Sequence, residues 1–118
     1  MRCMVIVKAS KDSEAGILPS TELLTNMGKF NEELVKAGVM LAGEGLQPSS
    51  KGKRITFTGS KPTITDGPFA EAKEIVGGFA LIQSKSRQEA IELTKTFMKI
   101  AGDGEVELRQ ICDVAPIP

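Results

Sequence analysis

The spacing of apolar residues changes along the chain between a pattern typical of strands and one typical of helices. The order of these patterns is the feature that most restricts the fold. Short apolar or alternating segments, which are typical of β-strands, occur at residues 1–8, 39–46, 75–83 and 105–114. In 20–37 and 86–101 the apolar residues recur at steps of three and four, as in amphipathic helices. Segments 54–58 and 61–65 alternate around Gly59-Ser60, which predicts a tight hairpin. This order predicts an α+β fold of the ferredoxin-like, split βαβ sandwich type with an inserted β-hairpin.

Polar residues and glycines mark where these elements begin and end. Ser20 is placed to cap the first helix, and Gly38 is placed to end it. Residues 12–19 are expected to form a polar turn. Gly43 and Gly45 predict a bulge or a close backbone approach in the second strand.

Length and charge narrow the class of protein. A chain of 118 residues has room for one core, so we expect a single domain over residues 1–118. Fifteen basic and fifteen acidic residues give a formal net charge of zero, so no overall field attracts nucleic acid. There is no membrane-spanning run of about 18 apolar residues and no signal-peptide cleavage site. We therefore expect a cytoplasmic protein without a membrane partner.

The chain contains no histidine, and this excludes several kinds of site. Histidine-metal sites, Ser-His-Asp triads and Cys-His nucleophiles all need an imidazole. The two cysteines, Cys3 and Cys112, have no CxxC spacing, which argues against a zinc site. We expect no metal and no cofactor, so any catalysis has to rely on other groups.

The expected topology has consequences for pairing between strands and between chains. Both helices cover the same face of the sheet, so the opposite face needs a partner. Apolar residues on both faces of 4–7 and 75–82 indicate that the second face is also largely buried. We therefore predict a homodimer whose sheets face each other.

The strand order 4-1-3-2 expected for this topology places the start of the first strand beside the end of the last. Cys3 and Cys112 are therefore expected to be neighbours. Two interpretations remain open for them, a pair of small buried thiols and a redox pair.

Three segments carry a resemblance to a known family. Residues 65–79, with the run Thr-Asp-Gly-Pro-Phe-Ala-Glu-Ala-Lys-Glu followed by Ile-Val-Gly-Gly-Phe, closely resemble the signature of DGPF-domain proteins in the YCII-related family. Residues 42–48 and 106–109 are similar to two further stretches of that family.

The resemblance implies a dimeric α/β barrel, in which two ferredoxin-like subunits pack sheet to sheet around a cleft. Relatives outside the DGPF branch are thought to use a His-Asp pair for acid-base work on small molecules, and some are enzymes of aromatic degradation. Because this chain lacks histidine, only the aspartate side of that pair can be present here. Some DGPF proteins are associated with sigma factors, which makes a protein-partner role conceivable.

The Asp-Gly-Pro-Phe segment supplies the first candidate residues. Asp66 is either a structural turn carboxylate or a group that also faces a ligand pocket, where it would transfer protons. Phe69 is a candidate for substrate contact beside it. Glu71 and Lys73 are either solvated loop charges or further substrate-binding residues.

The last strand supplies the second group. Arg109 alternates onto the face opposite Leu108, which this topology turns toward the dimer cleft, where a guanidinium could bind a substrate carboxylate. An ion pair with Glu107 is the rival explanation. Glu44, between two glycines, is a weaker substrate-binding candidate whose alternative role is part of a glycine bulge.

Two functions fit these expectations. The first is binding of a small polar or anionic metabolite in the dimer cleft, with Asp66 and Arg109 supporting cofactor-independent lyase or isomerase chemistry. The alternative is a non-catalytic binding or regulatory module, with a sigma factor as one conceivable associate.

Overall fold

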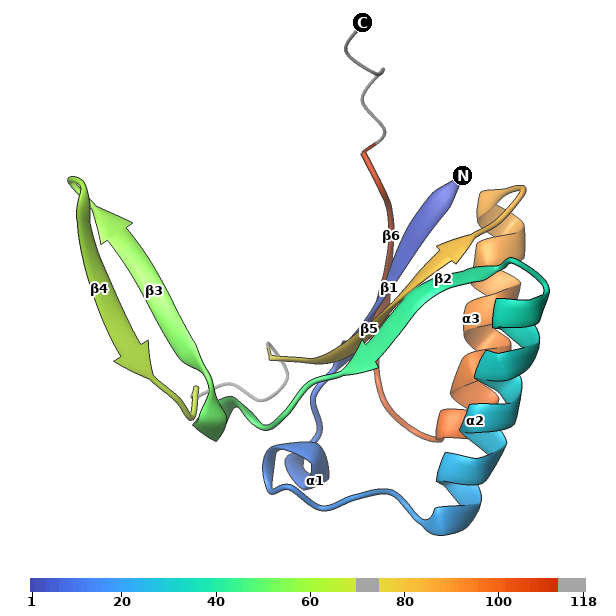
Figure 1. Ribbon diagram of the computed structural model, residues 1–118, viewed down its shortest axis with the longest axis horizontal. Coiled ribbons are helices and arrows are strands. Elements are labelled where there is room, and N and C mark those ends of the chain that lie inside the picture. The colour runs from blue at the N-terminus through green and yellow to red at the C-terminus, as the bar shows by residue number, and fades with distance from the viewer. Residues whose placement is uncertain (70–74, 113–118) are drawn as a thin grey trace, which may run out of the picture.

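A four-stranded antiparallel sheet forms the centre of the protein, seen in a computed structural model that describes residues 1–69 and 75–112 (Figure 1). Its strands are β1 (Arg2–Lys8), β2 (Met40–Gly45), β5 (Val76–Gln83) and β6 (Val106–Gln110). They are ordered β2-β5-β1-β6, and each neighbouring pair is antiparallel. This is the predicted 4-1-3-2 order, so the ferredoxin-like fold is confirmed.

Two helices, α2 (Thr21–Lys36) and α3 (Arg87–Ala101), lie side by side against one face of this sheet (Figure 1). Ser20 caps α2 as predicted, because its hydroxyl accepts a hydrogen bond from the Leu23 amide at 3.2 Å. Gly38 follows the end of α2 with φ +73°, the left-handed conformation that favours glycine. Neither they nor any other helix in the described ranges is long and apolar enough to span a membrane.

The core lies between the helices and the sheet. Its most buried members are Cys3, Val5, Ile82 and Ala90, which come from β1, β5 and α3. Because side chains alternate along a strand, the residues next to these in β1 and β5 face the other way, toward the side without helices.

The segment before α2 differs from the expected turn. It contains a short helix, α1 (Lys11–Glu14), instead of a continuous polar turn over residues 12–19. The hydroxyl groups of Ser10 and Ser13 each accept a hydrogen bond from the other residue's amide, at 3.0 and 2.8 Å. These reciprocal bonds satisfy amides at the helix start, and such a local arrangement leaves no periodic pattern in the sequence.

The glycines of β2 do not form the bulge that was predicted at their positions. The pairing of β2 with β5 shifts register between Met40 and Ala42, before Gly43. The close backbone approach lies on the opposite strand, where a Cβ on Gly78 would lie 2.9 Å from the Glu44 carbonyl oxygen. Gly78 is therefore the residue here that must lack a side chain.

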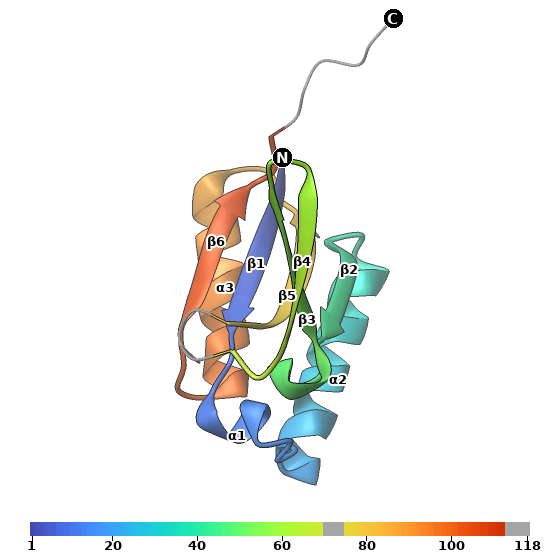
Figure 2. The ribbon, with the colours of Figure 1, turned by 90° about the vertical axis from the view of Figure 1, so that its left-hand side faces the viewer.

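The inserted hairpin consists of β3 (Lys53–Thr58) and β4 (Lys61–Asp66), which form a separate two-stranded sheet. Gly59 and Ser60 both have positive φ, at +57° and +68°, as a tight turn between antiparallel strands requires. Figures 1 and 2 show the hairpin on the side of the main sheet that has no helices, standing apart from it. The hairpin prediction is confirmed.

The two cysteines have different environments. Cys3 is buried and lies opposite Gln110 in the β1–β6 pairing, while Cys112 lies two residues further along and is exposed. Both are free thiols. The expectation of two buried neighbouring cysteines is therefore wrong for Cys112, because the β6 pairing ends before it.

Candidate functional site

The hairpin register determines the environment of Asp66. A two-residue turn at positions 59 and 60 pairs Thr58 with Lys61 and, at the base of the hairpin, Lys53 with Asp66. The Lys53 Nζ lies 2.5 Å from the Asp66 Oδ1, and both side chains are largely exposed. Asp66 thus closes the hairpin with a cross-strand ion pair.

The next residue, Gly67, joins the hairpin to the body of the protein. Its amide donates a hydrogen bond to the Gly52 carbonyl at 3.0 Å, so the two ends of the hairpin are connected. A Cβ at position 67 would overlap the carbonyl oxygen of Ser49. Ser49 begins the short 3₁₀ helix η1 (Ser49–Lys51), which packs directly beneath the Gly67-Pro68 turn, where the peptide bond is cis.

Ser49, which is buried, is the centre of a partly buried chain of hydrogen bonds. Its hydroxyl donates to a carboxylate oxygen of Glu14 at 2.5 Å and accepts from the amide of Phe69 at 3.1 Å. Its own amide donates to the other carboxylate oxygen of Glu14 at 3.0 Å. Neither Glu14 nor Ser49 was predicted from the sequence, since they lie 35 residues apart in two short helical turns that have no periodic pattern.

A surface pocket of about 400 Å³ opens beside the hydrogen bonds of Ser49, which itself lines the pocket. Lys51 and Arg54 supply its cations, and Leu46, Phe69 and Ile75 supply apolar walls. The Arg54 guanidinium lies over the Phe69 ring, 4.2 Å from the ring centre, which is a cation–π distance.

The helix-free face of the main sheet carries the second group of candidates. Strand pairing places eight residues on it in two rows of four, from β2 across β5 and β1 to β6. The rows are Glu44, Phe79, Ile6 and Glu107, and then Ala42, Leu81, Met4 and Arg109. The middle of this face is apolar and half-buried, and its edges carry the charges.

One edge of the helix-free face forms an ion triad. Glu107 lies 3.7 Å from the Lys8 Nζ through one carboxylate oxygen and 3.7 Å from the Arg109 Nε through the other. The side chain of Lys8 is 18% exposed and that of Arg109 is 69% exposed. Arg109 therefore lies on the predicted face, and the contact with Glu107 that was its rival explanation is also present.

Glu44 is exposed at the opposite edge. Three strand spacings of about 4.8 Å separate β2 from β6, so the backbones at Glu44 and Arg109, which also lie in different rows, are at least about 14 Å apart. Within one chain, a molecule that contacts both would have to reach across the full width of the sheet. Among the described residues no hydrogen bond or ion pair connects Asp66 with either of them.

Two further candidates, Glu71 and Lys73, lie outside the described residues. No group of three or more potential metal-ligating side chains gathers in ranges 1–69 and 75–112.

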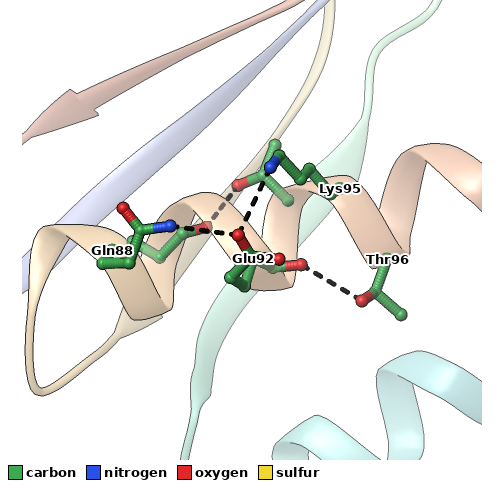
Figure 3. A network of polar contacts seen from close by, with 6 residues as sticks. Gln88, Glu92, Lys95 and Thr96 are labelled. Atoms are coloured by element: carbon green, nitrogen blue, oxygen red, sulfur yellow. Dashed lines mark hydrogen bonds and ion pairs between the residues drawn. The ribbon is translucent and has the colours of Figure 1, made fainter.

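The helix side of the protein offers less specific features. A depression of about 840 Å³ between α3 and β6 is lined by none of the predicted site residues. On the surface of α3, Glu92 accepts hydrogen bonds from Gln88 and Lys95 at 3.0 and 3.3 Å, and its carbonyl accepts from Thr96 (Figure 3). These are exposed contacts within one helix, typical of a solvated surface.

Comparison with known proteins places the chain in a family. The YCII-related domain matches residues 1–115. Uncharacterized protein R00369 of Rhizobium meliloti (strain 1021) is 25% identical over 95 residues, which make up 80% of this chain and 77% of that protein. The solved structure of the 5-chloro-2-hydroxyhydroquinone dehydrochlorinase TftG from Burkholderia phenoliruptrix AC1100, in complex with 2,5-dihydroxybenzoquinone, aligns with a TM-score of 0.49 and 13% identity over 94% of this chain and 93% of that chain. The match to the YCII-related domain over nearly the whole sequence shows that this chain belongs to the YCII-related family.

Proposed function

We propose that this protein binds a small anionic molecule on the helix-free face of its sheet, in a cleft closed by a second copy of the chain. The observation that carries this proposal is the ion triad, in which Lys8 and Arg109 share one carboxylate, Glu107. Two cations against one anion leave a local positive charge in a chain whose net charge is zero.

The chemistry of the triad favours a carboxylate ligand. Arg109 contacts Glu107 through its Nε at 3.7 Å, which is longer than a hydrogen bond, so its planar fork can turn toward an incoming carboxylate. Met4 and Leu81 share its row, and apolar neighbours strengthen a charged hydrogen bond once water is displaced. A carboxylate attached to a compact apolar body fits this combination.

A homodimer would complete the cleft. Met4, Ile6, Phe79 and Leu81 are only half-buried in the single chain, although they lie on the two central strands. An apolar sheet face of this kind needs a covering layer, and a second copy facing it would supply one.

If the protein also acts on the bound molecule, a carboxylate performs the acid-base chemistry, because the chain has no histidine. Asp66 would transfer the proton in a lyase or isomerase reaction, with Phe69 beside the substrate and Glu44, Glu71 and Lys73 as further candidates. The hairpin that carries Asp66 stands on the helix-free side, where the second copy would lie (Figure 1).

A non-catalytic binding or regulatory module is the second candidate function. The specific observation in its favour is that Asp66 is already paired with Lys53 and is exposed, as expected for a residue that closes a hairpin. Proton transfer would require that pair to open.

Thermal unfolding with simple probes tests the binding proposal. Succinate and benzoate are compared with their neutral amides, for the natural chain and for Arg109→Gln. Saturating ligand at 100 times its Kd adds about 2.7 kcal/mol of stability, so an increase of several degrees in Tm is expected. Lys36→Gln is the matched control, since Lys36 is also an exposed cation with one ion-pair partner, Glu32. Equal stabilisation of Arg109→Gln and the natural chain would contradict the assignment.

Exchange of solvent deuterium tests the catalytic version. The hydrogens beside the carbonyl of 2-oxobutyrate are followed by NMR in D₂O with the natural chain and with Asp66→Asn. A catalytic Asp66 predicts exchange that Asp66→Asn abolishes without loss of binding. Exchange unchanged by the substitution would instead favour the non-catalytic module.

A further inference from the structure

The β3–β4 hairpin has one apolar and one polar face. Ile55 lies opposite Ile64, and Phe57 lies opposite Pro62, so these four side chains share a face by strand alternation. Ile55, Phe57 and Ile64 are 61%, 71% and 62% exposed. The opposite face carries Arg54, Thr56, Thr58, Lys61, Thr63 and Thr65.

This exposure is unusual for a structured element. A two-stranded hairpin by itself is marginally stable in water, and neither of its strands pairs with the main sheet. Three large apolar side chains on one small ribbon form a contiguous patch, and such patches mark interaction sites. An amphipathic hairpin gains stability from its apolar face only when another surface covers that face.

The surface area indicates how large that cover is. The chain exposes 8674 Å², whereas a compact monomer of 12.6 kDa exposes about 6,200 Å². Even if the eleven residues outside the described ranges were as open as in an unfolded chain, they would supply only about 1,700 Å². An excess of about 770 Å² remains over the whole chain, close to the area of about 800 Å² that one partner buries in a standard protein interface.

The position of the hairpin favours a second copy of the chain as the cover. Both views show it on the same side of the sheet as the helix-free face (Figures 1 and 2). A twofold dimer uses the same patch on both subunits. A copy that packs on the helix-free face therefore comes to lie beside the hairpin of its partner.

From these observations we infer that the β3–β4 hairpin is a dimerisation arm whose apolar face, Ile55, Phe57, Pro62 and Ile64, packs against a second copy of this chain. The inference rests on the homodimer of the proposed function. It identifies the hairpin as the element that contacts the second copy. In such an arm the Lys53–Asp66 ion pair would hold the two strands together at the base of the hairpin.

A single tryptophan tests where the apolar face of the arm lies. The chain has no tryptophan and no tyrosine, so Phe57→Trp places the sole indole on this face. Its emission is followed as the protein is diluted, with sedimentation velocity on the same samples. We expect blue-shifted emission in the dimer and a red shift upon dissociation. Thr56→Trp, on the opposite face, should keep the emission of an exposed indole throughout. Exposed emission from Phe57→Trp in the dimer would overturn the inference.

A second pair of variants separates the arm from the dimer itself. Ile55→Thr with Ile64→Thr removes apolar contacts while keeping β-branched residues, and should weaken the dimer roughly tenfold or more. Thr56→Ser with Thr63→Ser changes the cross-strand pair on the polar face and should leave the dimer unchanged. Circular dichroism checks that both variants fold.

The outcomes are distinguishable. If the threonine variant stays as dimeric as the natural chain, the arm is wrong, while the homodimer and its ligand site stand. If the natural chain is a monomer at micromolar concentration, the homodimer is wrong, and the arm is wrong with it.

Discussion

The carbonyl oxygen of Ser49 fills the space beside Gly67 in which any other residue would place its Cβ. This contact fixes the Asp-Gly-Pro-Phe turn against η1, and the hydroxyl of the same serine holds the Phe69 amide. The turn is therefore a joint between the hairpin and the body of the protein, whatever else Asp66 does.

Gly67→Ala should destabilise the protein, because its Cβ requires either η1 or the turn to move. We expect a loss of about 1–3 kcal/mol in the free energy of unfolding, measured with urea. Gly28→Ala is the matched control. Gly28 lies within α2 with open space around it, and alanine there should add about 0.5–1 kcal/mol. If Gly67→Ala unfolded with the same free energy as the natural chain, η1 or the turn would have to move aside at little cost.

Ser49→Ala should cost about 1–3 kcal/mol, because the Phe69 amide and the Glu14 carboxylate each lose a buried partner. Glu14→Ala should behave similarly. The double variant should lose less than the two single losses combined, with a coupling of about 0.5–3 kcal/mol. Ser50→Ala, at an exposed neighbouring position, should stay within about 0.5 kcal/mol of the natural chain. Strict additivity would contradict the hydrogen-bond chain.

Ser20→Ala should lower stability by about 1 kcal/mol, since it removes the acceptor of the Leu23 amide at the start of α2. Thr25→Ala removes a hydroxyl from the same helix, where it donates to the Thr21 carbonyl at 2.8 Å, and should be neutral or slightly stabilising. Chemical denaturation of the two variants side by side checks the difference. Equal losses would show that capping is not what Ser20 contributes.

The thiols should react at different rates. A chromogenic disulfide reagent should find one accessible thiol in the native protein, Cys112, and two after unfolding, when Cys3 is released from the core. Cys112→Ser should bring the native count to zero. A native count of two would contradict the burial of Cys3, and a count of zero in unfolded protein would indicate a disulfide.

Much of the fold follows from the spacing of apolar residues and from the capping and turn residues between the elements. Ser20 and Gly38 bound α2, and the turn at Gly59-Ser60 sets the hairpin, because each is a local signal. α1 was missed because four residues are too short for a helical period. The register shift near Met40 was missed because a bulge depends on both paired strands.

The candidate site was predictable only in part. Alternation along β6 placed Arg109 on the correct face, and the two-residue turn would have sufficed to pair Lys53 with Asp66. The Glu14–Ser49 bond had no signal in the sequence, because it joins two short helical turns, α1 and η1, that only the tertiary fold brings together. The separation of Glu44 from Arg109, by contrast, follows from the predicted strand order, which puts their two strands at opposite edges of the sheet.

The hydrogen bond from the Gly67 amide to the Gly52 carbonyl joins the two ends of segment 53–66, so we expect this segment to tolerate replacement as a unit. Its two ends are already bridged at 3.0 Å, so the arm can be shortened by matched cross-strand pairs without disturbing the anchor. A recognition loop of another protein could be grafted there in its place. Because the bridge lies at the base, a change in hairpin length there leaves the two ends at the same separation, so the surrounding βαββαβ scaffold need not move.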